Sequence, residues 1–299
     1  MTRPILLLAL CASAGCRGDE FTTPLVLGGV EVPAATLNHG MKVYRRTCAS
    51  CHGIDGNGLT SAKNGDVQPR NFKRGAFKFV STPDNGLPTD EDLVRTVKNG
   101  LKGTQMQGFP DLMDDEVLAV TQYIKTFSPR WRREAVTKVV PIAPDPWSAG
   151  RRQEAIARGR LVYHGLAMCW TCHPAYAKED ELLSMARAMD VERKQVPRRS
   201  IPLRSDLDQP ARVETEYGKL LPPDFLGDTL RAARGVNDLY RAIAAGIGGT
   251  PMPTWYNKLS VQDLWAVVYY VRELARFRGT PQAAAYRSGL PGVPSSPLQ

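Results

Sequence analysis

The pattern of apolar and polar positions predicts a chain built of short α-helices. Thr89 precedes a run of acidic residues, as at a helix N-cap, and Gly100 is placed to end the helix. The apolar positions between them recur at helical spacing and are Leu93, Val94 and Val97. We therefore expect an amphipathic helix in this segment.

Two further helices are expected in the same part of the chain. Asn38 is placed to cap a short helix that leads directly into Cys48. Asp114 is placed to cap a longer helix, which Ser128 and Pro129 would end. The apolar face of that longer helix consists of Val117, Leu118, Val120, Thr121, Ile124 and Phe127.

These patterns occur again in the second half of the chain, which indicates a duplicated domain. Residues 159–163 repeat the Gly-x-x-x-Tyr pattern of residues 40–44. Residues 246–252 repeat residues 100–106, and both segments end in Gly-Thr-x-Met.

The offset between the two copies is expected to stay at 146 residues from Asp92 through Lys125. This offset pairs Tyr123 with Tyr269. It also gives Ser260 the capping role at the last helix that Asp114 has in the first copy.

The copies define two predicted domains, at residues 36–129 and about 154–280. A linker with several prolines, residues 130–153, would join them, and its tryptophans Trp131 and Trp147 are expected to pack on the domains. The second domain also carries a longer insertion.

The insertion lies at about residues 175–221 and has no counterpart in the first domain. It contains one expected helix, at 180–193, followed by a basic, proline-bearing run. That run has two open interpretations, a docking surface for an acidic partner or a solvated loop. The tail, residues 281–299, is rich in Pro, Ser and Gly and is expected to be disordered.

Residues 1–16 are predicted to be a targeting segment and not part of the fold. Arg3 precedes an apolar stretch, and small residues precede Cys16, as in a bacterial lipobox in which that cysteine is lipidated. The alternative is an ordinary signal peptide that is cut nearby. Residues 17–35 contain prolines and glycines without a helical period, so we expect a tether between the membrane anchor and the folded body.

Composition and charge narrow the classes of function. Charged residues make up 23% of the chain and hydrophobic residues 42%, which is ordinary for a soluble globular protein. The chain has no apolar run of about 18 residues, so no transmembrane helix is expected. The formal net charge of +9 favours acidic partners or an anionic surface, but no nucleic-acid-binding motif accompanies it.

Two CxxCH motifs carry the strongest chemical signal. They consist of Cys48, Cys51 and His52 in the first copy and of Cys169, Cys172 and His173 in the second. Two cysteines at this spacing can each form a thioether to a haem, and the histidine that follows can bind the iron. Attachment of haem in this way also implies the far side of the cytoplasmic membrane.

Two alternatives use the same residues. A structural zinc site brings CxxC pairs together, but a histidine directly after the second cysteine is poorly placed to join the same tetrahedron. A thioredoxin-like CxxC needs a βαβ context, whereas the surrounding sequence predicts helices. Because the whole motif occurs twice, each time followed by Gly-Thr-x-Met, haem attachment is the favoured interpretation.

With these motifs, each half resembles the class I c-type cytochromes. The shared order is a helix with Gly-x-x-x-Tyr, then CxxCH, then a Gly-Thr-x-Met loop, then a closing amphipathic helix. The resemblance covers about 36–129 and 154–275, and it implies an all-α fold of two tandem cytochrome c domains with two covalently bound haem c groups.

In this family the closing helix crosses the N-terminal helix beside the haem. The resemblance therefore implies that Gly40 and Tyr44 pack against the helix of Tyr123, and that the second copy repeats this with Gly159, Tyr163 and Tyr269. The sequence departs from the usual pattern at three places, which are Gln107 after Met106, Pro174 after His173, and a Tyr163 that lies two residues further from its motif than Tyr44 does.

Met106 and Met252 are the candidates for the sixth iron ligand, because they occupy equivalent positions in the two Gly-Thr-x-Met loops. A thioether ligand raises the reduction potential of haem and fills its coordination sphere. Core packing is the alternative for any methionine, and we expect it for Met113, the rival in the first copy. His39 and His164 precede the motifs and are expected at the surface or behind the iron ligands.

These predictions favour an electron carrier and not an enzyme. Each haem would take one electron, between a redox donor and an acceptor that dock through acidic surfaces. The protein would work on the periplasmic side of a bacterial membrane, anchored by lipid at Cys16. The alternatives are a di-haem enzyme, such as a peroxidase or a thiosulfate-type dehydrogenase with an open sixth position, or a subunit of a membrane redox complex.

Overall fold

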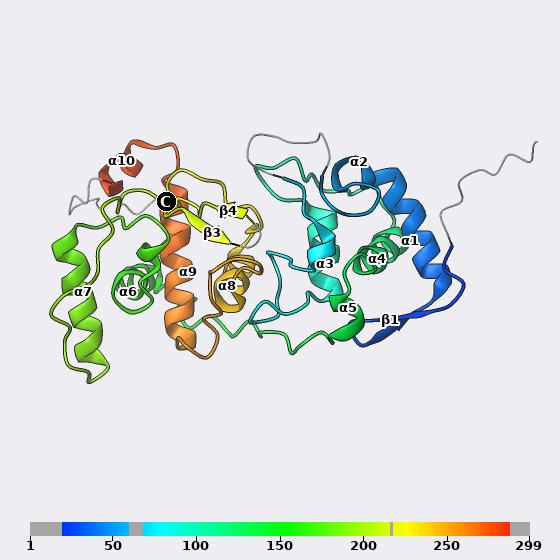
Figure 1. Cartoon of the computed structure of the whole chain (residues 1–299). Coiled ribbons are helices and arrows are strands. Elements are labelled where there is room, and N and C mark those ends of the chain that lie inside the picture. The colour runs from blue at the N-terminus through cyan, green and yellow to red at the C-terminus, as the bar shows by residue number, and fades with distance from the viewer. Residues whose placement is uncertain (1–19, 60–67, 216–217, 288–299) are drawn as a thin grey trace, which may run out of the picture.

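The computed structural model describes residues 20–59, 68–215 and 218–287, and Figure 1 shows two helical halves side by side. In this part of the chain the strands are short and form two separate hairpins. The predicted all-α class is therefore confirmed. The predicted targeting segment, with Cys16, lies outside the described residues.

The first half runs from the N-terminal hairpin to the short helix before the linker. Its elements are β1 (Leu25–Leu27), β2 (Val30–Val32), α1 (Ala34–Thr47), α2 (Ala49–His52), the 3-10 turn η1 (Phe72–Arg74), α3 (Asp90–Asn99), α4 (Asp114–Lys125) and α5 (Arg130–Arg133).

The second half repeats the order of the three main helices of the first half, and it adds elements in the insertion and after the closing helix. Its elements are α6 (Arg152–Leu161), the π-helix η2 (Val162–Leu166), the 3-10 turn η3 (Cys169–Thr171), α7 (Glu179–Glu192), β3 (Val213–Thr215), β4 (Gly218–Leu220), α8 (Val236–Ala245), α9 (Val261–Arg276) and α10 (Pro281–Arg287).

In each half the first and last helices cross at a glycine. A Cβ atom added at Gly40 would lie 2.0 Å from the carbonyl oxygen of Ala119 in α4. A Cβ atom added at Gly159 would lie 2.0 Å from the carbonyl oxygen of Ala266 in α9. No side chain fits at either crossing, so each glycine lets two helix backbones approach directly.

The expected pairing of Tyr123 with Tyr269 is wrong by one residue. Tyr123 lies beside Gly40, and the side chain beside Gly159 is that of Tyr270. Tyr269 points elsewhere and donates a hydrogen bond to Asp145 in the linker, at 2.7 Å. The reason is one extra residue between the Gly-Thr-x-Met loop and the closing helix of the second half.

The capping predictions were right at two helices and wrong at two others. Thr89 caps α3 through a reciprocal capping box, and Ser260 caps α9 by accepting from the backbone N–H of Asp263. Helix α4 begins at Asp114, so its N-cap is Met113. Helix α1 begins before Asn38, whose side-chain amide instead holds the N-terminal segment by two hydrogen bonds to the backbone of Phe21.

The expected tether at residues 17–35 is wrong for its described part. Residues 25–32 form the β1–β2 hairpin, and Leu27 and Val32 are buried against Trp131. The turn is made by Gly28 and Gly29, both at positive φ. A Gly-Gly pair between apolar residues is a hairpin signal, which explains why this segment forms a hairpin and not a tether.

The insertion of the second half is a packed part of the domain. Its helix α7 matches the expected helix within one residue at each end, and it lies against η2, where a Cβ atom added at Gly165 would be 2.4 Å from the carbonyl oxygen of Met185. The tail, expected to be disordered from residue 281, first forms α10, in which Arg287 pairs with Asp224 at 2.5 Å. Residues 288–299 lie outside the described part.

The linker is held against both halves. The backbone N–H of Val140 donates to Ser81 of the first half at 2.8 Å, and the Trp265 indole of the second half donates to Ala143 at 3.0 Å. As expected, the two tryptophans pack on the domains, Trp131 on the first and Trp147 on the second.

The halves meet through reciprocal hydrogen bonds, and we call this contact the seam. The backbone N–H of Lys102 donates to the carbonyl oxygen of Arg231 at 2.8 Å, and that of Gly248 donates to Lys78 at 3.1 Å. Lys102 corresponds to Gly248 in the repeat. Lys78 and Arg231 correspond because each lies six residues after an equivalent phenylalanine, Phe72 or Phe225, so each bond is the counterpart of the other. Such reciprocity is the mark of a two-fold interface.

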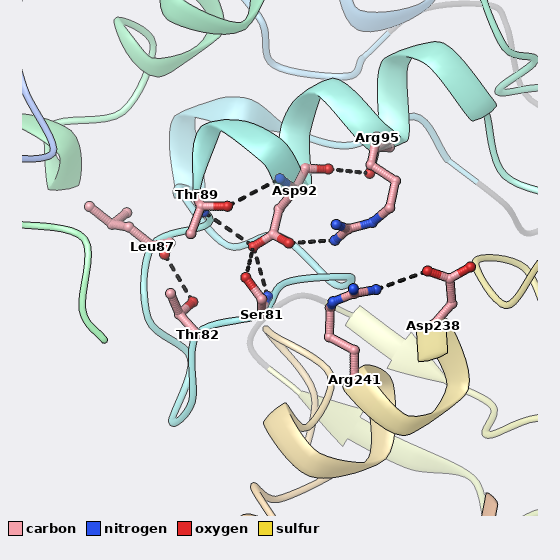
Figure 2. Close-up of polar contacts among 9 residues, drawn as sticks. Ser81, Thr82, Leu87, Thr89, Asp92, Arg95, Asp238 and Arg241 are labelled. Atoms are coloured by element: carbon pink, nitrogen blue, oxygen red, sulfur yellow. Dashed lines mark hydrogen bonds and ion pairs between the residues drawn. The ribbon is translucent and has the colours of Figure 1, made fainter. Parts of the chain in front are cut away.

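Figure 2 shows the helices beside the seam, where an equivalent ion pair occurs on each side. Asp92 pairs with Arg95 on α3, and Asp238 pairs with Arg241 on α8 at 2.8 Å. Arg95 and Asp238 also line one small cavity between the halves. The seam therefore brings together the same edge of both domains, next to their Gly-Thr-x-Met loops.

Candidate haem attachment sites

The first CxxCH motif forms the short helix α2, which orients His52. The Nδ1 atom of His52 lies 3.0 Å from the carbonyl oxygen of Arg70, and its ring stacks on Phe72 with centroids 4.4 Å apart. A carbonyl can only accept, so Nδ1 carries the hydrogen and Nε2 keeps the lone pair that binds a metal. This is the usual support of a metal-binding histidine.

The second motif reproduces this geometry. The Nδ1 atom of His173 lies 2.9 Å from the carbonyl oxygen of Pro223, and its ring stacks on Phe225 at 4.7 Å. Burial lowers the pKa of both histidines, which favours the neutral, ligating form. Two independent segments of sequence have thus built the same histidine site.

A buried tyrosine fixes the backbone directly after each histidine. The hydroxyl of Tyr44 donates to the carbonyl oxygen of Gly53 at 2.7 Å, and that of Tyr163 donates to Pro174 at 2.8 Å. Tyr163 lies two residues further from its motif, and the π-helix η2 takes up the difference with a hydrogen bond from Ala167 to Val162. Pro174 occupies the position that Gly53 has in the first half, and its carbonyl oxygen accepts the equivalent hydrogen bond.

The four motif cysteines are reduced and half-buried. Burial raises the pKa of Cys48 to about 11 and that of Cys169 to about 12, so both are neutral thiols at ordinary pH. In each half the two thiols share one turn with a histidine whose Nε2 is free to bind iron. The residues thus fit a covalently attached haem.

The two Gly-Thr-x-Met loops have the same conformation. The backbone N–H of Met106 donates to Thr104 Oγ1 at 3.1 Å, and that of Met252 donates to Thr250 Oγ1 at 3.2 Å. Gly103 and Gly249 occupy equivalent positions with φ near +70°, a conformation that side chains rarely adopt. The loop therefore presents a methionine at the same place in each half.

The surroundings of the three candidate methionines differ. Met106 and Met252 are both half-buried, and Met252 packs against the core of the second half. Met113 was expected in the core, and this is wrong, because it is 64% exposed as the N-cap of α4.

His164 is not at the surface, which was one of the two places expected for it. It is fully buried, and its Nδ1 and Nε2 atoms both face carbonyl oxygens, those of Arg160 and Ala175. His39 is half-buried. The rigid contacts of His164 hold the π-helix behind the second motif and leave it unsuited to bind iron.

The arrangement does not match the zinc alternative. Within residues 20–59, 68–215 and 218–287, no three His, Cys, Asp or Glu side chains gather as a metal cluster. The two CxxC pairs lie in separate halves, the first at α2, which is labelled in Figure 1, and the second at η3.

Comparisons with known proteins agree with this geometry. Residues 35–124 match the family model of cytochrome c oxidase, cbb3-type, subunit III. Residues 35–124 form a cytochrome c domain. A cytochrome c domain implies a covalently bound haem c, and the matched residues contain the first CxxCH motif and the Met106 loop.

A solved structure resembles the chain over both halves. It is a chain of the Kuenenia stuttgartiensis reducing HAO-like protein complex Kustc0457/Kustc0458, with 28% sequence identity and a TM-score of 0.62. The similarity covers 79% of this chain and 95% of that one. No curated protein matches the sequence. Among the described residues, no helix is long and apolar enough to cross a membrane.

Proposed function

We propose that the protein carries two covalently bound haem c groups and transfers single electrons between redox partners. The residues that would hold the first haem are Cys48, Cys51, His52 and Met106, and those for the second are Cys169, Cys172, His173 and Met252. The haem supplies the one-electron chemistry when bound, and the chain supplies attachment, axial ligands and a dry surrounding.

One observation carries this proposal, namely the repetition of the histidine site. His52 and His173 have the same carbonyl partner position, the same stacked phenylalanine and the same tyrosine contact behind them. A structural role for two buried histidines does not require their orientation to be copied so closely. An iron ligand does, because its Nε2 must point at the metal.

The methionine loops favour an electron carrier over an enzyme. A methionine that binds the iron as its sixth ligand would leave no position for a small substrate. The loop geometry around Met106 and Met252 is the same, so we expect both irons to be closed. The chain would then hold both haems closed to small substrates, so that its role is the transfer of electrons to and from a partner.

A role within a larger redox assembly is the second candidate, because the matching solved chain belongs to a redox protein complex. In both roles the net charge of +9 favours partners with an acidic docking surface. We place the protein on the periplasmic side of a bacterial membrane, where haem c is attached, with lipid at Cys16 as its anchor.

Counting the haem groups tests the proposal directly. The purified protein should contain two haem c groups per chain, measured by mass and by the absorbance of the denatured pyridine complex. Replacing Cys48 and Cys51 with Ala, or Cys169 and Cys172 with Ala, should leave one haem in each case. A native protein with one haem, or a cysteine pair that can be removed without loss, would refute the assignment of that half.

A further inference from the structure

An arginine from the insertion reaches back to the second CxxCH turn. The Nη2 atom of Arg204 donates to the carbonyl oxygens of Trp170 at 3.3 Å, His173 at 3.2 Å and Gln209 at 2.7 Å. The Arg204 side chain is 18% exposed. It therefore ties the loop after α7 to both ends of the turn that holds His173.

The first half supports the same carbonyl in another way. The carbonyl oxygen of His52 accepts from the backbone N–H of Gly58 at 2.8 Å. Gly58 ends the glycine-rich loop 53–58, which has no equivalent after Pro174. A neutral amide at the first site is thus replaced by a guanidinium group at the second.

The replacement places a permanent positive charge beside the second iron ligand. An arginine side chain stays protonated at every ordinary pH. Its acidic neighbour Asp206, at 2.8 Å, is 55% exposed, so water screens that carboxylate more than it screens the less exposed Arg204 side chain. A charge next to a buried group interacts more strongly than one in water.

We propose that Arg204 is a positioning residue of the second haem site that also raises the reduction potential of that haem. Reduction adds an electron to the haem, and a nearby positive charge stabilises the reduced state. The hydrogen bonds to Trp170 and His173 keep the turn and the histidine in place. This inference rests on the proposed two-haem function and deepens it, because it makes the two haems unequal.

Redox titration of the full-length protein, followed at the α-band of each haem, tests the inference. Arg204→Gln should lower the midpoint potential of the second haem and leave that of the first unchanged. Arg204→Lys keeps the charge and should retain the larger part of the potential. An unchanged second potential in Arg204→Gln, or equal shifts in the two variants, would overturn the role of the charge.

A second substitution keeps the test valid if Arg204→Gln does not fold. Asp206→Asn removes the neighbouring carboxylate and should raise the potential of the second haem. Glu154→Gln is the matched control, since it makes the same change of charge at the exposed pair with Arg151. A shift no larger than in this control would contradict the inference.

The haem count distinguishes a failure of the proposed two-haem function from a failure of the proposed role of Arg204. If the second motif carries no haem, the proposed function itself fails. If both haems are present and neither Arg204 nor Asp206 affects the second potential, only the inference about Arg204 fails.

Discussion

The two halves share the contacts that touch the histidine and differ in what surrounds them. The carbonyl partner of Nδ1, the stacked phenylalanine and the tyrosine behind the turn are present at both His52 and His173. Behind the turn, the first half uses the glycine loop ending at Gly58 and the second uses Arg204. The two halves thus share the geometry around the histidine and differ in the layer outside it.

The outer layers also differ in how they seal the sites. The second half has one continuous core, to which Trp170, Leu182 and Met185 belong, so α7 covers the side of the domain behind the CxxCH turn. The first half divides its buried residues between a cluster around Tyr44 and a cluster around Trp131. A larger core excludes water better, so we expect the second haem to be the better protected of the two.

The largest expected effect is on the midpoint potential of each haem when its candidate methionine is replaced. Met252→Ala and Met106→Ala should each open one iron and lower its midpoint potential by tenths of a volt, on the order of the range that axial ligands control. Carbon monoxide binding to the reduced protein would report the open site. An unchanged potential in one variant would refute that methionine as a ligand, and Met113→Ala is the control because its side chain is exposed.

Adding a methyl group at each helix crossing tests how much that crossing contributes to the stability of its half. Gly159→Ala and Gly40→Ala would each push a methyl group into a carbonyl oxygen 2.0 Å away, and each should cost about 3 kcal/mol or more. Chemical denaturation would measure the loss in free energy of unfolding. Gly235→Ala is the control, since its added Cβ meets nothing within 4 Å. Equal stability of the three variants would show that these crossings are not as tight as described.

The smallest expected effect lies at the seam. Asn85 Oδ1 accepts from the backbone N–H of Gly249 at 2.9 Å, in a loop present in the first half alone. Asn85→Gly removes this bond and keeps the positive φ, so it should cost about 1 kcal/mol. Asn257→Gly is the matched control, an exposed asparagine also at positive φ. If both cost the same, the bond adds nothing to the docking of the halves.

The sequence predicted those features that depend on local pattern. The capping residues Thr89 and Ser260 and the equivalence of the Gly-Thr-x-Met loops followed from residue type and spacing. The cytochrome c fold was recognised from its motifs, because attachment chemistry requires two cysteines and a histidine at fixed spacing. The ligand roles themselves remain predictions.

Features that depend on packing between distant segments were missed. A one-residue insertion before α9 moved the crossing contact from Tyr269 to Tyr270, and an assumed constant offset could not reveal it. The hairpin at residues 25–32 is stabilised by Trp131, which lies about a hundred residues further along the chain. Arg204 looked like one of many basic residues, since its carbonyl partners become neighbours only after folding.

The visible spectrum of the purified protein, oxidised and reduced, with and without carbon monoxide, tests the central claim most directly. If both irons are held by a histidine and a methionine, neither reduced haem binds carbon monoxide. The oxidised protein then shows the methionine–iron charge-transfer band with the intensity of two haems. Ready binding of carbon monoxide by either haem would contradict the account, because that iron would be open and the protein suited to catalysis at that site.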